Sequence, residues 1–183
     1  MPTAQTFVIV GASLAGAKAA ETLRLGSFPG RIILISEEPV RPYERPPLSK
    51  AYLRGEADFD TAAVHPAGFY DEPDIELRTS TTVTSINPGA STVDLDSGET
   101  LGYHRLLLTT GAQPRRLTVP GSDLPGVLYL RSVADSDHLR QAVTANMPVV
   151  VIGAGWIGAE VAASARQLGA DVSLVEMAQV PLE

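Results

Sequence analysis

Residues 148–176 read PVVVIGAGWIGAEVAASARQLGADVSLVE, and this stretch is the clearest indication of the fold class. The apolar, β-branched run at 148–152 predicts a strand that is buried on both faces, as in parallel sheets. Gly153–Gly158 has the pattern G-x-G-x-x-G, and the alanine-rich residues 159–168 predict a helix that leads to a second strand at 172–176. This order of strand, glycine turn, helix and strand predicts a βαβ unit of the kind that binds dinucleotides.

Each glycine of this turn has its own predicted role. Gly153 permits the tight turn, Gly155 lets a pyrophosphate approach the backbone, and Gly158 lets helix and strand pack closely. The helix begins near Trp156 and Ile157, where free N–H groups and the positive end of the helix dipole face the phosphates. A turn without a ligand would contain the same glycines, but here they stand in the required order of elements.

The beginning of the chain repeats this plan at residues 6–37, which read TFVIVGASLAGAKAAETLRLGSFPGRIILISE, with strands expected at Thr6–Val10 and Arg31–Ile35. The predicted turn consists of Gly11, Ala12, Ser13, Leu14, Ala15 and Gly16. Ser13 stands where the second glycine is expected. Serine is small enough for a phosphate to come near, although it narrows the approach. Taken alone, this unit also fits a plain turn with no ligand.

An acidic residue follows each turn at the end of the next strand, about 20 positions on, where an acid meets ribose hydroxyls. In the second unit it is Glu176, and in the first it is Glu37, with Glu38 as an alternative. One unit binds one nucleotide, so two units predict two cofactors. The economical interpretation is FAD at the first turn and NAD at the second.

Composition excludes several other classes of protein. The absence of cysteine excludes a disulfide scaffold, a thiolate-bound metal and a redox-active cysteine pair. A net charge of −7 disfavours nucleic-acid binding, and no apolar run reaches the about 18 residues that a membrane span needs. The histidines, at His65, His104 and His138, are too scattered to predict a metal site. We therefore expect a cytoplasmic protein whose cofactors supply its chemistry.

The sequence between the two units predicts a mixed arrangement. Pro39–Pro47 excludes regular helix or central strand, and a short polar helix is expected around Leu48–Gly55. Residues 75–108 alternate with a period of two, which predicts a small antiparallel meander. Ser132–Asn146 predicts a further helix. The expected fold class is α/β: a Rossmann-like parallel sheet with helices and a meander, followed by a truncated second Rossmann unit.

Residues 45–50, RPPLSK, place two cations on a stiff loop shortly after the first ribose acid. Arg45 is suited to a pyrophosphate. Lys50 is suited to the edge of a flavin ring, where a cation stabilises negative charge as electrons arrive. A solvated basic loop is the alternative interpretation.

Four stretches together resemble the FAD-dependent ferredoxin and rubredoxin reductases of the pyridine nucleotide-disulfide oxidoreductase superfamily. They are VIVGASLAGAKAAETLR (8–24), RPYERPPLSKAYL (41–53), LLLTTGAQPR (106–115) and residues 149–176. The RPPLSK stretch is the most specific, because disulfide reductases carry redox cysteines in the corresponding region. Members of the family serve bacterial cytochrome P450 and ring-hydroxylating dioxygenase systems.

The resemblance implies that electrons pass from NADH through FAD to a ferredoxin or rubredoxin. It implies catalytic roles for Lys50, close to the isoalloxazine, and for Glu160, near the contact between nicotinamide and flavin. The implied FAD-binding residues are Gly11, Ser13, Leu14, Ala15, Gly16, Glu37, Arg45, Lys50, Val83, Thr110, Gly111 and Arg131. The implied NAD-binding residues are Gly153, Gly155, Trp156, Ile157, Gly158 and Glu176.

The expected domains are an FAD-binding domain at 1–115, a connecting segment and helix at 116–147, and the beginning of an NAD-binding domain at 148–183. A doubly wound sheet needs more strands than this last segment contains. We therefore expect the N-terminal portion of the enzyme, either as a truncated product or as a fragment of a longer chain. The alternative is a catalytically inactive nucleotide-binding module, which pairs with another chain or self-associates to cover its apolar faces.

Overall fold

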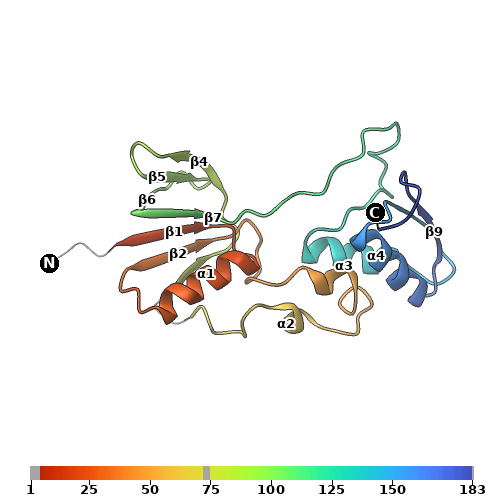
Figure 1. Cartoon of the computed structure of the whole chain (residues 1–183), viewed down its shortest axis with the longest axis horizontal. Helices are drawn as coiled ribbons and strands as arrows, with labels where there is room; N and C mark the ends of the chain where they lie inside the picture. Colours follow the sequence, from red (N-terminus) through yellow and green to blue (C-terminus); the bar gives the residue numbers. More distant parts are fainter. Residues whose placement is uncertain (1–4, 72–74, 183) are drawn as a thin grey trace. The chain divides into compact units, whose positions relative to one another are not determined.

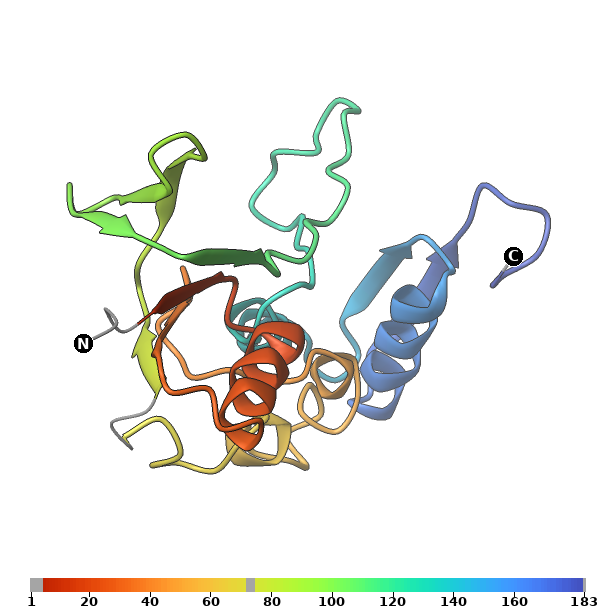
Figure 2. The ribbon, with the colours of Figure 1, turned by 60° about the vertical axis from the view of Figure 1, so that its left-hand side comes forward.

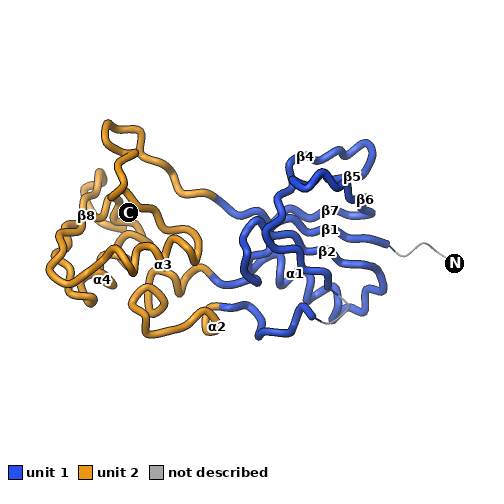
Figure 3. The backbone as a smooth tube through the Cα atoms, turned by 180° about the vertical axis from the view of Figure 1, so that it is seen from behind, with its two compact units in different colours: residues 1–44, 63–112 blue, residues 45–62, 113–183 orange. Residues whose placement is uncertain are grey.

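The computed structural model describes residues 5–71 and 75–182, and the chain divides into two compact units. The first unit takes in residues 1–44 and 63–112, and the second takes in residues 45–62 and 113–183 (Figure 3). Each unit therefore combines segments that are far apart in the sequence. Within the described ranges, no helix has the length and hydropathy to cross a bilayer.

A four-stranded parallel sheet forms the first unit, in the order β3-β2-β1-β7 (Figure 1). Its first two strands, β1 (Thr6–Val10) and β2 (Arg31–Ile35), match the sequence-based prediction. Helix α1 (Leu14–Leu25) connects them and begins directly after the glycine turn. Because the strands are parallel, their carboxyl ends share one edge of the sheet, and this edge carries the turn and Glu37.

The prediction of a single antiparallel meander at residues 75–108 is wrong for its first and last strands. Only β4 (Val83–Asn87), β5 (Thr92–Leu95) and β6 (Thr100–Gly102) form an antiparallel sheet. The first and last predicted strands, β3 (Ile75–Arg78) and β7 (Arg105–Leu108), join the parallel sheet instead. An alternating pattern specifies that a segment is a strand, but it does not specify the neighbouring strand.

Side chains of β2 alternate between two hydrophobic cores. Ile32 and Leu34 pack in a cluster with Ala20 of α1, and Ile33 and Ile35 pack in a cluster with the β5 and β6 side chains. These four side chains are at most 1% exposed. Figure 2 shows α1 and the β4–β6 sheet on opposite sides of the parallel sheet. The continuous apolar run of this strand is thus explained by burial on both faces.

The second unit contains the second βαβ unit and the segments packed on it. Its elements are η1 (Pro46–Ser49, a 3₁₀ helix), α2 (Phe59–Ala62), α3 (Val133–Ala142), β8 (Pro148–Ile152), α4 (Trp156–Gln167) and β9 (Asp171–Val175). Strands β8 and β9 pair in parallel, as predicted. The helix expected around 48–55 is instead the short η1. It begins at two prolines, which are tolerated only in a first helical turn.

One face of the β8–β9 sheet carries exposed apolar side chains. Val150 and Ile152 are each 62% exposed, and Val175, which pairs with Ile152 and shares this face, is 50% exposed. Strands of this composition are normally buried on both faces. The sequence-based expectation that a single βαβ unit leaves apolar surface uncovered is therefore confirmed.

Candidate functional site

The glycine turn of the second unit follows β8 directly. Gly153 has a φ of +100°, which favours glycine, and a Cβ built on Gly158 would lie 1.8 Å from the Gly153 carbonyl oxygen. A Cβ on Gly155 would meet no atom within 4 Å. The protein's own structure thus requires the first and third glycines but not the second. The space above Gly155 is open, and its use by a phosphate group stays a prediction.

The glycine turn of the first unit is built in the same way around Gly11 and Gly16. Gly11 has a φ of +105°, and a Cβ on Gly16 would lie 2.1 Å from the Gly11 carbonyl oxygen. Ser13, at the second position, is half-buried and its hydroxyl donates to the Tyr43 carbonyl at 3.4 Å. The hydroxyl is therefore turned toward the protein.

The helices behind the two turns have uncapped N-termini. Neither Ser13 before α1 nor Gly155 before α4 makes a side-chain capping hydrogen bond, and neither first turn contains an acidic residue. In contrast, α3 begins with a complete capping box, in which Ser132 and Asp135 satisfy each other's backbone N–H groups. The first N–H groups of α1 and α4 remain as donors for an anion. They belong to the predicted residues Leu14, Ala15, Gly16, Trp156, Ile157 and Gly158.

The two acidic residues after β2 differ in their contacts. The Tyr43 hydroxyl donates to Glu38 at 2.5 Å. Glu37 is exposed, and no described residue donates a hydrogen bond to its side chain. Glu37 is thus the less engaged of the two carboxylates, and its contact with a ribose stays a prediction.

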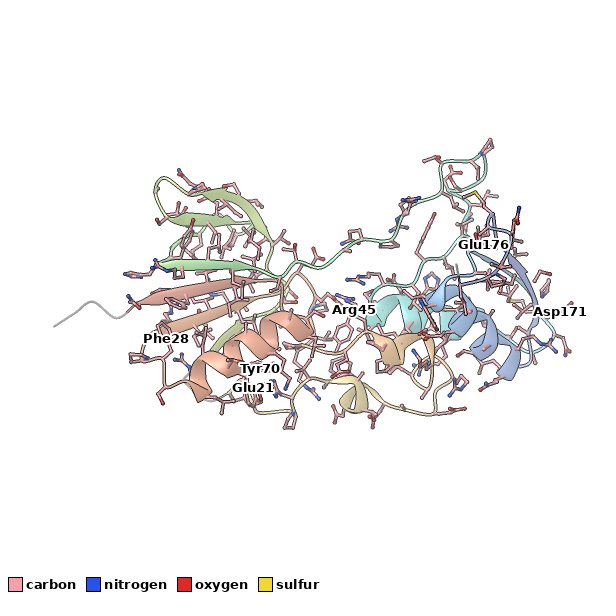
Figure 4. All side chains as sticks on the ribbon, in the orientation of Figure 1. Glu21, Phe28, Arg45, Tyr70, Asp171 and Glu176 are labelled. Carbon is pink, nitrogen blue, oxygen red and sulfur yellow. The ribbon has the colours of Figure 1, made fainter. Side chains whose placement is uncertain are left out.

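Glu176 follows β9 (Figure 4), and its side chain is hydrogen-bonded to the second glycine turn. Its carboxylate accepts from the backbone N–H groups of Ala154 at 2.5 Å, Met177 at 2.6 Å and Ala178 at 3.1 Å. These backbone donors lower the pKa of the Glu176 carboxyl, with Ala154 making the largest contribution. The predicted ribose acid is thus held ionised beside the turn.

The two predicted catalytic residues form an ion pair in the second unit. Lys50 Nζ lies 2.6 Å from Glu160 Oε2, and the Ser49 hydroxyl donates to the same oxygen at 2.5 Å. Hydrogen bonds from Lys50 and then Ser49 lower the pKa of the Glu160 carboxyl. Lys50 also donates to the Pro46 carbonyl at 3.0 Å. The ammonium therefore has two fixed acceptors, which a freely solvated side chain would lack.

The remaining predicted FAD residues are divided between the units. In the second unit, Arg45 Nη1 donates to the Arg131 carbonyl at 2.5 Å, so these two predicted residues lie together. In the first unit, Val83 packs against the β2 core, and Thr110 and Gly111 are exposed just after β7. No group of three or more His, Cys, Asp or Glu side chains in residues 5–71 and 75–182 is arranged to hold a metal ion.

Two residues near these sites were missed by sequence reasoning. Thr109 Oγ1 donates to the Gly11 carbonyl at 2.7 Å and thereby ties the end of β7 to the first glycine turn. Ser49 contacts Glu160, as described above. Thr109 precedes the predicted Thr110, and Ser49 precedes the predicted Lys50. Thr109 and Ser49 stand out only by their contacts with Gly11 and Glu160, which are distant in sequence. No local sequence pattern reveals such contacts.

The sequence matches the protein family described as "Pyridine nucleotide-disulphide oxidoreductase" over residues 5–183. The chain belongs to this pyridine nucleotide-disulphide oxidoreductase family. The expected α/β fold class with its FAD/NAD-binding Rossmann-like architecture is thereby confirmed.

Relatives within the family are similar over almost the whole chain. The chain is 44% identical to rhodocoxin reductase of Rhodococcus erythropolis over 97% of its own length and 42% of that relative. It is 44% identical to rubredoxin-NAD(+) reductase of Pseudomonas putida over 93% of its length and 44% of that relative. The solved complex of putidaredoxin reductase with putidaredoxin matches with a TM-score of 0.92 and 38% identity, covering 99% of this chain and 44% of that one. The chain thus spans less than half the length of these relatives.

Proposed function

We propose that this chain supplies the two nucleotide sites of an NADH-dependent FAD reductase that delivers electrons to a ferredoxin or rubredoxin. The observation that carries the proposal is the pair of uncapped helices, each behind a glycine turn and each in a βαβ unit whose second strand is followed by a carboxylate. The names of the relatives, which include a rubredoxin-NAD(+) reductase and a reductase in complex with putidaredoxin, support the direction of electron flow. We further propose that this reductase is cytoplasmic and, from the family resemblance, that it serves a cytochrome P450 or dioxygenase system.

The residues at each turn fit a dinucleotide. In the first unit, the N–H groups at the start of α1 would hold the FAD pyrophosphate and Glu37 the adenosine ribose. In the second unit, the open space above Gly155 and the start of α4 would hold the NAD pyrophosphate, with Glu176 at the ribose. We assign these roles because free N–H donors and an ionised acid are what phosphate and ribose groups bind.

Bound FAD and NADH supply the redox chemistry, which is acceptance of a hydride and release of electrons one at a time. The sequence has no cysteine, so no thiol of this chain takes part in that chemistry. The chain's own contribution is electrostatic. Glu160 and the Pro46 carbonyl hold the Lys50 ammonium in one place, and a cation held in this way would stabilise negative charge on a bound flavin.

The single tryptophan of the sequence offers a direct test of nucleotide binding. Trp156 is the first residue of α4 and is 73% exposed, so its fluorescence reports on the second turn. NADH should quench this fluorescence, and FAD should shift the amide NMR signals of Leu14, Ala15 and Gly16 in the first turn. If neither nucleotide produces its effect at millimolar concentration, the proposed function is wrong.

A second candidate function is a nucleotide-binding module without turnover. The exposed apolar face of β8–β9 favours it, because such a face normally packs against further structure. The two functions are separated by mixing the FAD-loaded protein with NADH under nitrogen. Bleaching of the flavin absorption supports the reductase, and unchanged absorption with normal NADH binding supports the module.

A further inference from the structure

Two buried serines hold the loop that carries Lys50. Ser136 on α3 and Ser164 on α4 are 0% and 1% exposed. The Ser136 hydroxyl donates to the Leu48 carbonyl and the Ser164 hydroxyl to the Ser49 carbonyl, both at 2.7 Å. These are consecutive carbonyls of η1, the 3₁₀ helix that leads directly into Lys50.

The same helix that clamps the loop also carries the partner of Lys50. Glu160 and Ser164 are four residues apart on α4 and therefore lie on one face of the helix. Ser49 contacts both of them, since its carbonyl accepts from Ser164 and its hydroxyl donates to Glu160. Arg54 Nη1 further donates to the Ser164 hydroxyl at 3.3 Å. Loop, helix and ion pair are thus connected through a short chain of hydrogen bonds.

We propose that Ser136 and Ser164 are positioning residues, which act through the Leu48 and Ser49 carbonyls to hold the Lys50 ammonium against Glu160. The proposal rests on the proposed function, in which Lys50 acts at the flavin. Loss of either hydroxyl leaves a buried carbonyl without its donor, and the loop relieves this by moving the carbonyl toward water. Lys50 directly follows these carbonyls, so its ammonium moves with them.

The Glu160 carboxyl provides a readout that does not need a cofactor. In ¹³C NMR titrations of the 183-residue chain, Lys50→Met gives the Glu160 midpoint without its ion-pair partner. Ser164→Ala and Ser136→Ala should each raise the midpoint from the wild-type value toward that of Lys50→Met. Ser173→Ala, which alters an exposed serine of β9, is the matched control and should leave the midpoint unchanged.

A purely structural role for the serines predicts a different result. Ser164→Ala would then lower the urea midpoint of unfolding while Glu160 titrates as in the wild type, and this outcome overturns the proposal. Ser164→Cys keeps the volume but donates weakly, so it gives the same test if the alanine variant does not fold. Quenching of Trp156 by NADH is measured in parallel. Loss of quenching in the wild type contradicts the proposed function, whereas an unmoved Glu160 midpoint contradicts only the positioning role.

Discussion

Replacing Gly155 by alanine should separate nucleotide binding from folding. The residue has a φ of −70° and a ψ of −178°, which alanine adopts without strain, and its new methyl group would meet no protein atom within 4 Å. Alanine reduces the freedom of the unfolded chain but is a poorer N-cap residue than glycine, so the free energy of unfolding should change by less than about 1 kcal/mol. The methyl group would nevertheless occupy the space that we assign to the pyrophosphate.

The expected loss of NADH affinity follows from the donors that the methyl group displaces. Losing one hydrogen bond to a charged group weakens binding by about 1.5–3 kcal/mol, or roughly tenfold to a hundredfold. Gly126→Ala is the matched control, since a Cβ there also meets nothing within 4 Å and lies outside the turn. Gly158→Ala should instead destabilise the fold by about 1–3 kcal/mol or more, because of its 1.8 Å approach to a carbonyl oxygen. The dissociation constant is measured by titrating Trp156 fluorescence with NADH. An unchanged value for Gly155→Ala would show that the pyrophosphate does not occupy the space above this residue.

Four further predictions rest on the same structure. NADPH should quench Trp156 more weakly than NADH, because the ionised Glu176 repels a 2′-phosphate; equal affinities would contradict this. Lys50→Met should lower the reduction potential of bound flavin in a spectroelectrochemical titration. It should change the free energy of unfolding by less than about 1 kcal/mol, because the Lys50–Glu160 pair is partly exposed. An unchanged potential would mean that Lys50 belongs to a solvated basic loop. Ser132→Ala should lower unfolding free energy by about 0.5–2 kcal/mol in urea, and Ser13→Ala by less, because only Ser132 caps its helix. Limited proteolysis should cut residues 148–182 first, and the purified protein should contain little FAD. A yellow, monomeric, protease-resistant protein would show that the exposed β8–β9 face weakens packing less than we infer.

The sequence predicts elements well where one pattern admits only one structure. Strands β1, β2 and β8 begin and end at the predicted residues, because their apolar runs are bounded by polar or glycine residues. The sequence does not predict the pairing of β3 and β7, whose partners are β2 and β1 rather than their neighbours in the meander. Strand pairing depends on contacts that are distant in sequence, and a period of two contains no information about them.

The candidate site shows the same limit at the level of single residues. Lys50 and Glu160 are expected from the family resemblance, and the structure joins them in one ion pair. The buried serines that support this pair were not expected. Ser136 and Ser164 lie in the middle of helices, where serine usually signals an exposed position or a cap. Their burial and their acceptors on η1 follow only from how α3 and α4 pack against the loop.

The contrast between helix N-termini is the strongest argument that both glycine turns serve ligands. If the turns were only connections, capping would stabilise α1 and α4 as it stabilises α3, where Ser132 and Asp135 satisfy the first donors. Gly155 has no side chain with which to cap, but Ser13 has one, and its hydroxyl is turned away toward the Tyr43 carbonyl. Two different residues therefore leave the same donors open at equivalent positions. A phosphate is the group that such an end of a helix binds, so an open N-terminus in each unit is better explained by two nucleotides than by two imperfect turns.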